Sequence, residues 1–305
     1  MGQGGMTMDT YAVSRYREAC ALLPEGLRTE ALALPVPVQG TAEELRLRTG
    51  SPLTCATPSG ERPAGKRAVS PWDLEQVLDV VTGYSRYTAA ETLRQGYLTA
   101  RGGFRVGLCG SAVVEDGEVR TLTAFSSLSI RIPREQVGVA LPLLKQLTED
   151  GRPCSTLILG PPGEGKTTLL RDLIRLLSDR IGLRVALADE RGEIAAMYRG
   201  TPQLQVGRHT DVMDACPKAL AIPALLRAMN PQVIAVDEVA LPADVEAMER
   251  ASHTGTALLA TVHAHTPDDL LRRPLLSSMM ELGIFQRTVT IERVEGGRRY
   301  RVEAG

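Results

Sequence analysis

The sequence contains few of the residues that build disulfide frameworks or transition-metal sites. Its five cysteines are scattered without a C-x-x-C pair, and its four histidines lack metal-ligand spacing. Scattered cysteines argue against a disulfide framework or a zinc site and are typical of a reducing compartment. We therefore expect a cytoplasmic protein without a transition metal.

Positive charge, aromatic residues and long apolar runs are also scarce. The net charge is −1 and aromatic residues make up 4% of the chain, whereas proteins that bind single-stranded nucleic acid combine a positive groove with stacking rings. Nucleic acid is therefore not the expected partner. The sequence shows no signal peptide and no uncharged apolar stretch long enough to span a membrane. Any membrane attachment is expected to be peripheral, at the inner face of the cell membrane and through partners.

The 305 residues are enough for two domains. We predict an α+β N-terminal domain over 10–134, whose sheet is mostly antiparallel. It would contain strands at 43–48 and 127–132, a hairpin or loop at 52–68, helices at 71–81 and 89–95, and a hairpin at 97–109. A helix over 135–149 would lead into the second domain.

The second domain, residues 135–305, changes to a rhythm of strand, loop and helix. Its predicted strands are short and apolar, at 156–159, 184–189, 233–237 and 257–262. Such strands are typical of a parallel sheet that is buried on both faces. A hairpin over 288–302, turned at Gly296 and Gly297, would close the chain. The fold class is therefore α/β, with a mainly parallel sheet in this C-terminal domain.

The most informative motif is a G-x-x-x-x-G-K-T sequence between an apolar strand and an amphipathic helix, the context that a Walker A motif requires. Its glycines let backbone N–H groups cradle phosphate oxygens, and the helix dipole favours the same anion. Lys166 would reach the β- and γ-phosphates, and the Thr167 hydroxyl would hold Mg²⁺. The predicted ATP-binding residues are Gly160, Pro161, Pro162, Gly163, Glu164, Gly165, Lys166, Thr167 and Thr168.

Two strands end in an Asp-Glu pair. Asp237 and Glu238 follow an apolar strand as in a Walker B motif, where the aspartate would hold Mg²⁺ through water. Asp189 and Glu190 repeat the pattern on the strand after the P-loop helix. Either glutamate could activate the attacking water, and residue chemistry alone divides this role evenly between them.

His263 ends a further strand and could sense the γ-phosphate or link it to a neighbouring subunit; the alternative is a histidine bonded to backbone. A P-loop site also commonly needs an arginine, often from another subunit. The candidates in this half of the chain are Arg191, Arg208, Arg227 and Arg250. The alternative for each is an ordinary solvated side chain on the surface.

Taken together, these residues resemble the stage III sporulation protein AA family, which is similar to secretion-type ATPases within the AAA/RecA-like P-loop class. The matching stretches are 104–110, 129–132, 160–168, 189–194, 210–218, 226–238 and 261–263. The segment Asp-Val-Met-Asp-Ala-Cys-Pro-Lys within 210–218 is more specific to the family than either Walker motif.

The resemblance implies an ATP hydrolase with ATP and Mg²⁺. Glu190 becomes the favoured catalytic base, Asp237 and Glu238 form Walker B, and His263 is the histidine-box residue. It also implies a homo-hexamer that docks on membrane proteins of a sporulation secretion-like complex. In such a ring the first domain would cap the nucleotide, with Arg105 and Arg131 as candidate contacts.

One departure from this pattern keeps alternatives open. Secretion ATPases usually carry a glycine and an arginine after the Walker B acids, but here the residues are Val239, Ala240 and Leu241. The leading interpretation is an ATPase that powers a sporulation-associated channel. The alternatives are a RecA-like ATPase that handles nucleic acid and an ATP-gated scaffold with little turnover.

Overall fold

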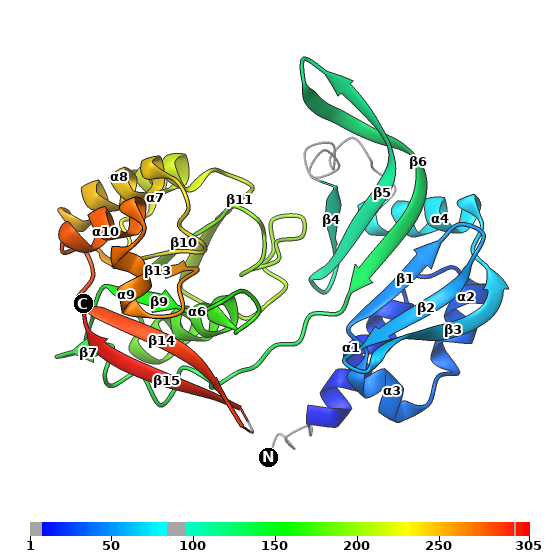
Figure 1. Cartoon of the computed structure of the whole chain (residues 1–305), viewed down its shortest axis with the longest axis horizontal. Coiled ribbons are helices and arrows are strands. Elements are labelled where there is room, and N and C mark those ends of the chain that lie inside the picture. Colours follow the sequence, from blue (N-terminus) through cyan, green and yellow to red (C-terminus); the bar gives the residue numbers. More distant parts are fainter. Residues whose placement is uncertain (1–7, 84–95, 296) are drawn as a thin grey trace. The chain divides into compact units, whose positions relative to one another are not determined.

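A computed structural model of the protein describes residues 8–83, 96–295 and 297–305. The chain divides into two units, each with its own hydrophobic core (Figure 1). Unit 1 contains the described residues up to Arg134 together with the short segment Tyr198–Gln203. Unit 2 contains Glu135–Met197 and Leu204–Gly305.

Unit 1 is an α+β structure built on a six-stranded sheet of order β3-β2-β1-β6-β5-β4, in which every strand pair is antiparallel. The strands are β1 (Glu44–Arg48), β2 (Pro52–Thr57), β3 (Gly60–Ala68), β4 (Tyr97–Ala100), β5 (Phe104–Glu115) and β6 (Glu118–Arg131). The helices are α1 (Met8–Cys20), α2 (Glu25–Leu32), α3 (Val36–Thr41) and α4 (Pro71–Thr82).

The local sequence explains these elements. In β6, Leu128 and Ile130 are buried while Ser129 lies between them on the other face, as the alternation predicts. The predicted helix at 71–81 is confirmed as α4: a capping box formed by Ser70 and Asp73 starts it, and Gly83 ends it with φ of 60°. The predicted helix at 89–95 lies outside the described residues.

Unit 2 contains a seven-stranded sheet of order β11-β10-β12-β13-β9-β14-β15. Neighbouring strands are parallel from β11 to β14, and only β15 is antiparallel. The strands are β9 (Thr156–Leu159), β10 (Val185–Asp189), β11 (Thr210–Asp214), β12 (Val233–Val236), β13 (Ala257–Val262), β14 (Arg287–Val294) and β15 (Gly297–Ala304). The helices are α6 (Lys166–Leu176), η2, a π-helical turn (Leu177–Ile181), α7 (Lys218–Met229), α8 (Pro242–Ser252), α9 (Pro267–Leu271) and α10 (Pro274–Glu281).

The four predicted strands and the closing hairpin of this unit are confirmed, but the helix predicted at 135–149 is wrong. Most of that segment forms turns, and its end pairs as β7 (Thr148–Glu149) with β8 (Arg152–Pro153). Gly138 has φ of 93°, which a right-handed helix does not allow, and Pro142 lacks the N–H that a helix interior needs. Leu143 and Leu147 are buried without helical geometry.

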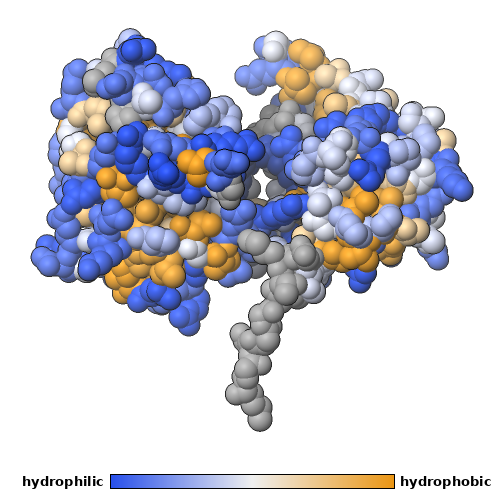
Figure 2. Space-filling view, turned by 60° about the horizontal axis from the view of Figure 1, so that its bottom comes forward, coloured by the Kyte–Doolittle hydropathy of each residue, from blue (hydrophilic) through white to orange (hydrophobic). Residues whose placement is uncertain are grey.

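The surface shown in Figure 2 is mostly polar, with apolar areas on both units. Exposed large apolar residues include Val36 and Trp72 in unit 1, and Leu220 and Leu241 in unit 2. Among the described residues, no helix has both the length and the apolar character that crossing a bilayer requires.

Candidate functional site

The loop from Gly160 to Gly165 connects the end of β9 with the start of α6 and lies at the carboxyl edge of the parallel strands. Ligands of open α/β sheets bind at this edge. Gly163 and Gly165 have φ of 80° and 93°, values that favour glycine and that turn backbone N–H groups toward the loop interior. The local geometry is that of a P-loop.

Lys166, the first residue of α6, folds back over this loop. Its ammonium donates hydrogen bonds to the carbonyl oxygens of Gly160 at 2.7 Å and Pro161 at 2.8 Å. Burial lowers the pKa of Lys166, although the nearby Asp237 and Glu238 carboxylates oppose the shift. An anion in the loop would offer this cation a stronger partner than two carbonyl groups.

Thr167 and Asp237 come together from α6 and the end of β12. The Thr167 hydroxyl donates to Oδ2 of Asp237 at 2.8 Å, and the Thr261 hydroxyl from β13 donates to Oδ1. Hydroxyl and carboxylate oxygens are the ligands that Mg²⁺ prefers, usually together with water and substrate phosphates. The oxygen pair of Thr167 and Asp237 therefore fits the predicted Mg²⁺ site.

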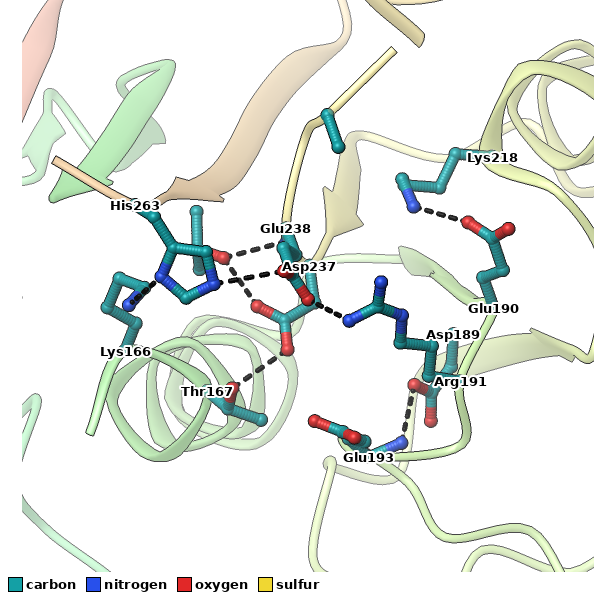
Figure 3. Close-up of polar contacts among 12 residues, drawn as sticks. Lys166, Thr167, Asp189, Glu190, Arg191, Glu193, Lys218, Asp237, Glu238 and His263 are labelled. Atoms are coloured by element: carbon teal, nitrogen blue, oxygen red, sulfur yellow. Dashed lines mark hydrogen bonds and ion pairs between the residues drawn. The ribbon is translucent and has the colours of Figure 1, made fainter. Parts of the chain in front are cut away.

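Figure 3 shows His263 between Lys166 and Glu238. Nδ1 of His263 lies 2.8 Å from the Lys166 ammonium, and Nε2 lies 2.9 Å from Oε1 of Glu238. Arg191 forms an ion pair with the other oxygen of the same carboxylate. Glu238 has φ of 52°, an unusual value for a residue with a side chain and one that occurs frequently at functional sites.

Asp189 anchors the loop that follows β10. This buried carboxylate accepts hydrogen bonds from the backbone N–H groups of Glu193 at 3.0 Å, Ile194 at 3.2 Å and Ala195 at 2.8 Å. Burial raises the pKa of Asp189 above its ordinary value, and the hydrogen bonds from the amides partly oppose this shift. Because all three amides belong to the loop, the role of Asp189 in this geometry is to hold the loop in shape.

Glu190 is not in contact with Lys166, Thr167 or Asp237. Its carboxylate forms an ion pair with Lys218, the first residue of α7, and Figure 3 shows it directed away from Thr167. Lys218 is 6% exposed, and a lysine this buried needs an acidic partner. The sequence motifs predict no role for Lys218, although its place in the family-specific segment is a signal.

Glu193 is a third acidic residue near the site, and the sequence motifs predict no role for it. Figure 3 shows its carboxylate on the side of the loop that faces Thr167 and Asp237. The loop carbonyls of Glu193 and Ile194 each accept a hydrogen bond of 2.6 Å from Arg171 of α6. Its only signal in the sequence was its position within the Asp-Glu-Arg-Gly-Glu-Ile stretch.

The arginines named from the sequence have different surroundings. Arg191 lies in the site, whereas Arg208 pairs with Asp179 at 3.4 Å and Arg250 pairs with Glu246 of its own helix. Arg227 lines a cavity of 1360 Å³ together with Ser155, Arg184, Gln232 and Ala257, which lie at the amino ends of the parallel strands. That edge of the sheet is opposite the P-loop. In unit 1, Arg131 is 3.3 Å from Glu44, and Arg105 stacks 3.7 Å from the ring centroid of Tyr97.

The sequence of this chain matches a protein-family model and a curated relative over most of its length. The family model described as "Sporulation stage III, protein AA" matches residues 15–302. The stage III sporulation protein AA of Bacillus subtilis (strain 168) is 38% identical over 283 residues, which are 92% of this chain and 92% of the relative.

Two solved structures of ATPase and motor proteins align with most of this chain. The pilus retraction motor PilT, solved with bound ADP, aligns with a TM-score of 0.62 at 19% identity, over 90% of this chain and 81% of PilT. The ATPase DotB of Legionella pneumophila aligns with a TM-score of 0.56 at 17% identity, over 86% of this chain and 76% of DotB. These similarities confirm the predicted fold class.

Proposed function

Because the chain belongs to the stage III sporulation protein AA family, we propose that it is a Mg²⁺-dependent ATPase that powers a sporulation-associated membrane channel or secretion-like complex. The observation that carries the proposal is the convergence of Lys166, Thr167 and Asp237 at the carboxyl edge of the sheet. The fold shared with PilT, which was solved with ADP, supports a nucleotide as the ligand.

In this proposal the loop amides and Lys166 bind the phosphate chain of ATP. Lys166 exchanges its bonds to the Gly160 and Pro161 carbonyls for bonds to the β- and γ-phosphates. The side-chain oxygens of Thr167 and Asp237 are the groups that would hold Mg²⁺. When bound, the ion neutralises charge on the phosphate oxygens.

Glu238 is the residue whose position best suits activation of the attacking water. It follows the Mg²⁺-binding Asp237, and His263 fixes its carboxylate at the edge of the P-loop. Glu190, which the family resemblance favours, is directed away from Thr167 toward its partner Lys218. We therefore assign the base role to Glu238 and treat Glu190 as the second candidate.

The proposed assembly follows from the family rather than from the geometry. We propose a homo-hexamer at the inner face of the cell membrane, attached through membrane proteins of the sporulation complex. The missing glycine and arginine after Walker B, where this chain has Val239, Ala240 and Leu241, specifically favours an ATP-gated scaffold as the second candidate function.

The test combines binding, turnover and mass. Wild type is expected to bind Mg-ATP, to release phosphate, and to change from monomer to a six-fold mass with Mg-ATP. Lys166→Ala should lose binding, because no other lysine lies in the loop. Binding without phosphate release, even with the membrane partners present, would favour the scaffold; a monomeric protein that binds oligonucleotides in a salt-dependent way would favour a role with nucleic acid.

A further inference from the structure

The C-terminal hairpin lies directly beside the P-loop. β14 is the parallel neighbour of β9, whose last residue precedes Gly160. Ile291 of β14 lies close to Gly160: a Cβ atom added to the glycine would be 3.4 Å from the Cβ atom of Ile291. The cross-strand partner of Ile291 is Tyr300 of β15. Both residues pack on the unit 2 core, so they lie on the inner face of the hairpin.

Two arginines follow on this same face. Arg293 lies two residues after Ile291 on β14, and Arg298 lies two residues before Tyr300 on β15. The two arginines are directly opposite each other in the strand register. A Cβ atom added to Gly165 would lie 3.2 Å from Cζ of Arg298. Arg293 lies 3.9 Å from the carboxylate of Glu164. Both guanidinium groups therefore stand next to P-loop residues.

This arrangement is electrostatically unfavourable without an anion. Like charges directly opposite each other on two strands destabilise the pair. Arg298 forms no ion pair with any described residue, and the contact of Arg293 with Glu164 is a long one. Glu292, the nearest acid on β14, is paired with Arg301 at 3.0 Å. A bound phosphate group would relieve this repulsion.

The sheet order shows which part of a nucleotide these arginines can reach. β9 lies between β13 and β14, so Asp237 and His263 are on one side of the P-loop strand and the hairpin is on the other. The first side holds the residues assigned to Mg²⁺ and to the water that attacks the γ-phosphate. The hairpin therefore lies on the side where the α- and β-phosphates would be bound.

We propose that Arg298, supported by Arg293, binds the α- and β-phosphates of the nucleotide from the C-terminal hairpin of the same subunit. The proposal rests on the proposed ATPase function and adds a subsite to it. A guanidinium suits this role because its planar fork can donate two parallel hydrogen bonds to phosphate oxygens. ATP and ADP share these two phosphates, so the contact contributes equally to the binding of both and does not act on the hydrolysis step.

The test measures the dissociation constants of Mg-ATP, Mg-ADP and inorganic pyrophosphate with the full-length protein. Arg298→Gln is expected to weaken the binding of all three ligands about 10-fold or more, because a hydrogen bond to a charged group contributes about 1.5–3 kcal/mol. Arg298→Lys should restore part of the affinity because it keeps the charge.

Arg299→Gln is the matched control. Arg299 is the next residue on the same strand, is exposed, and is paired in register with Glu292 on the opposite face. The Arg299→Gln variant should bind all three ligands with the affinity of the wild type. Thermal unfolding of each variant reports whether the hairpin has kept its structure.

Two results would overturn the proposal while leaving the ATPase function intact. In the first, Arg298→Gln binds all three ligands as the wild type does. In the second, it loses ADP affinity but keeps pyrophosphate affinity, which would mean that the guanidinium contacts the nucleoside and not the phosphates. If the wild type itself bound no nucleotide and no pyrophosphate, the proposed function and this subsite would both fail.

Discussion

Nε2 of His263 is hydrogen-bonded to the carboxylate of Glu238 at 2.9 Å, while its Nδ1 faces the Lys166 ammonium at 2.8 Å. A carboxylate can only accept and an ammonium can only donate, so this geometry requires Nε2–H and an unprotonated Nδ1. The imidazole is therefore neutral and held in one tautomer. It connects Lys166, the residue proposed to contact phosphate, with Glu238, the residue proposed to activate water.

Replacing this histidine should impair turnover more than binding. His263→Ala leaves Lys166 and the loop amides in place, so the dissociation constant of Mg-ATP is expected to change less than about 3-fold. Phosphate release should fall about 10- to 100-fold because Glu238 loses the partner that orients it. Steady-state kinetics with separate nucleotide binding measures both. Equal loss of binding and turnover would instead mean that His263 holds the P-loop together.

The two candidate bases can be distinguished by their amide variants. Glu238→Gln is expected to lower the rate of phosphate release at least about 100-fold while Mg-ATP still binds, because the amide cannot accept the proton. Glu190→Gln should lower it less than 10-fold, since its carboxylate is occupied by Lys218. Single-turnover measurements avoid any contribution from product release. The reverse order would assign the base to Glu190 and show that the pair with Lys218 opens when nucleotide binds.

Asp189 offers a test of loop anchoring. Asp189→Leu would leave three amide groups, two of them buried, without their acceptor, so unfolding of the chain in urea should require about 3 kcal/mol less free energy. Asp189→Asn keeps one oxygen acceptor and should cost less. Asp214→Leu is the control, because Asp214 is paired with Asp189 in register on β11 but is exposed. If both leucine variants were equally stable, the amide bonds would contribute nothing to the anchoring.

Asp73 predicts an acid-dependent loss of stability in unit 1. Burial opposes ionisation of its carboxyl, but Arg67 and Ser70 outweigh this and bring the pKa to about 2, below the ordinary 3.8. Because the folded-state pKa is the lower one, the contribution is complete above pH 4 and is lost as the pH falls through 2. Arg67 is 45% exposed, so solvent screening limits the contribution to about 1–2 kcal/mol.

Urea unfolding of wild type and Asp73→Asn tests this linkage. The variant should be less stable by that amount at pH 7, and the difference should shrink between pH 4 and 2. Arg67→Gln with the double variant measures the coupling within the pair. A difference that stays constant over this range would show that the helix cap, and not the charge, accounts for the effect.

Much of the site could be predicted from sequence because its parts follow strand ends. The P-loop motif located Lys166 and Thr167, and the parallel strands bring Asp237 and His263 to the same edge. The pairing of Glu190 with Lys218 could not be predicted, because nothing in the local pattern at the end of β10 indicates which cation from a later helix meets this carboxylate. The proposed role of Arg298 could not be predicted either, since it depends on register within an arginine-rich hairpin.

The fold was predictable where the spacing of apolar residues agrees with the residues that start and end an element. α4 has an apolar face, a capping serine and a terminal glycine, and its limits were predicted closely. The segment 135–149 has helix-forming composition, but Gly138 and Pro142 outweigh it. β11 was missed because its residues are half-buried or exposed and lack the apolar run of the central strands.

The placement of Tyr198–Gln203 in unit 1 affects how this protein can be dissected. The backbone passes between the units after Arg134, again after Met197 and again after Gln203. Within unit 1, Gln203 accepts a hydrogen bond from the Gly102 amide at 2.7 Å, and Arg199 donates to the Gly83 carbonyl at 3.3 Å. A fragment that begins at residue 135 would carry this segment away from those partners. The units are thus not interchangeable modules joined by one linker, and their roles are better separated with point substitutions than with truncations.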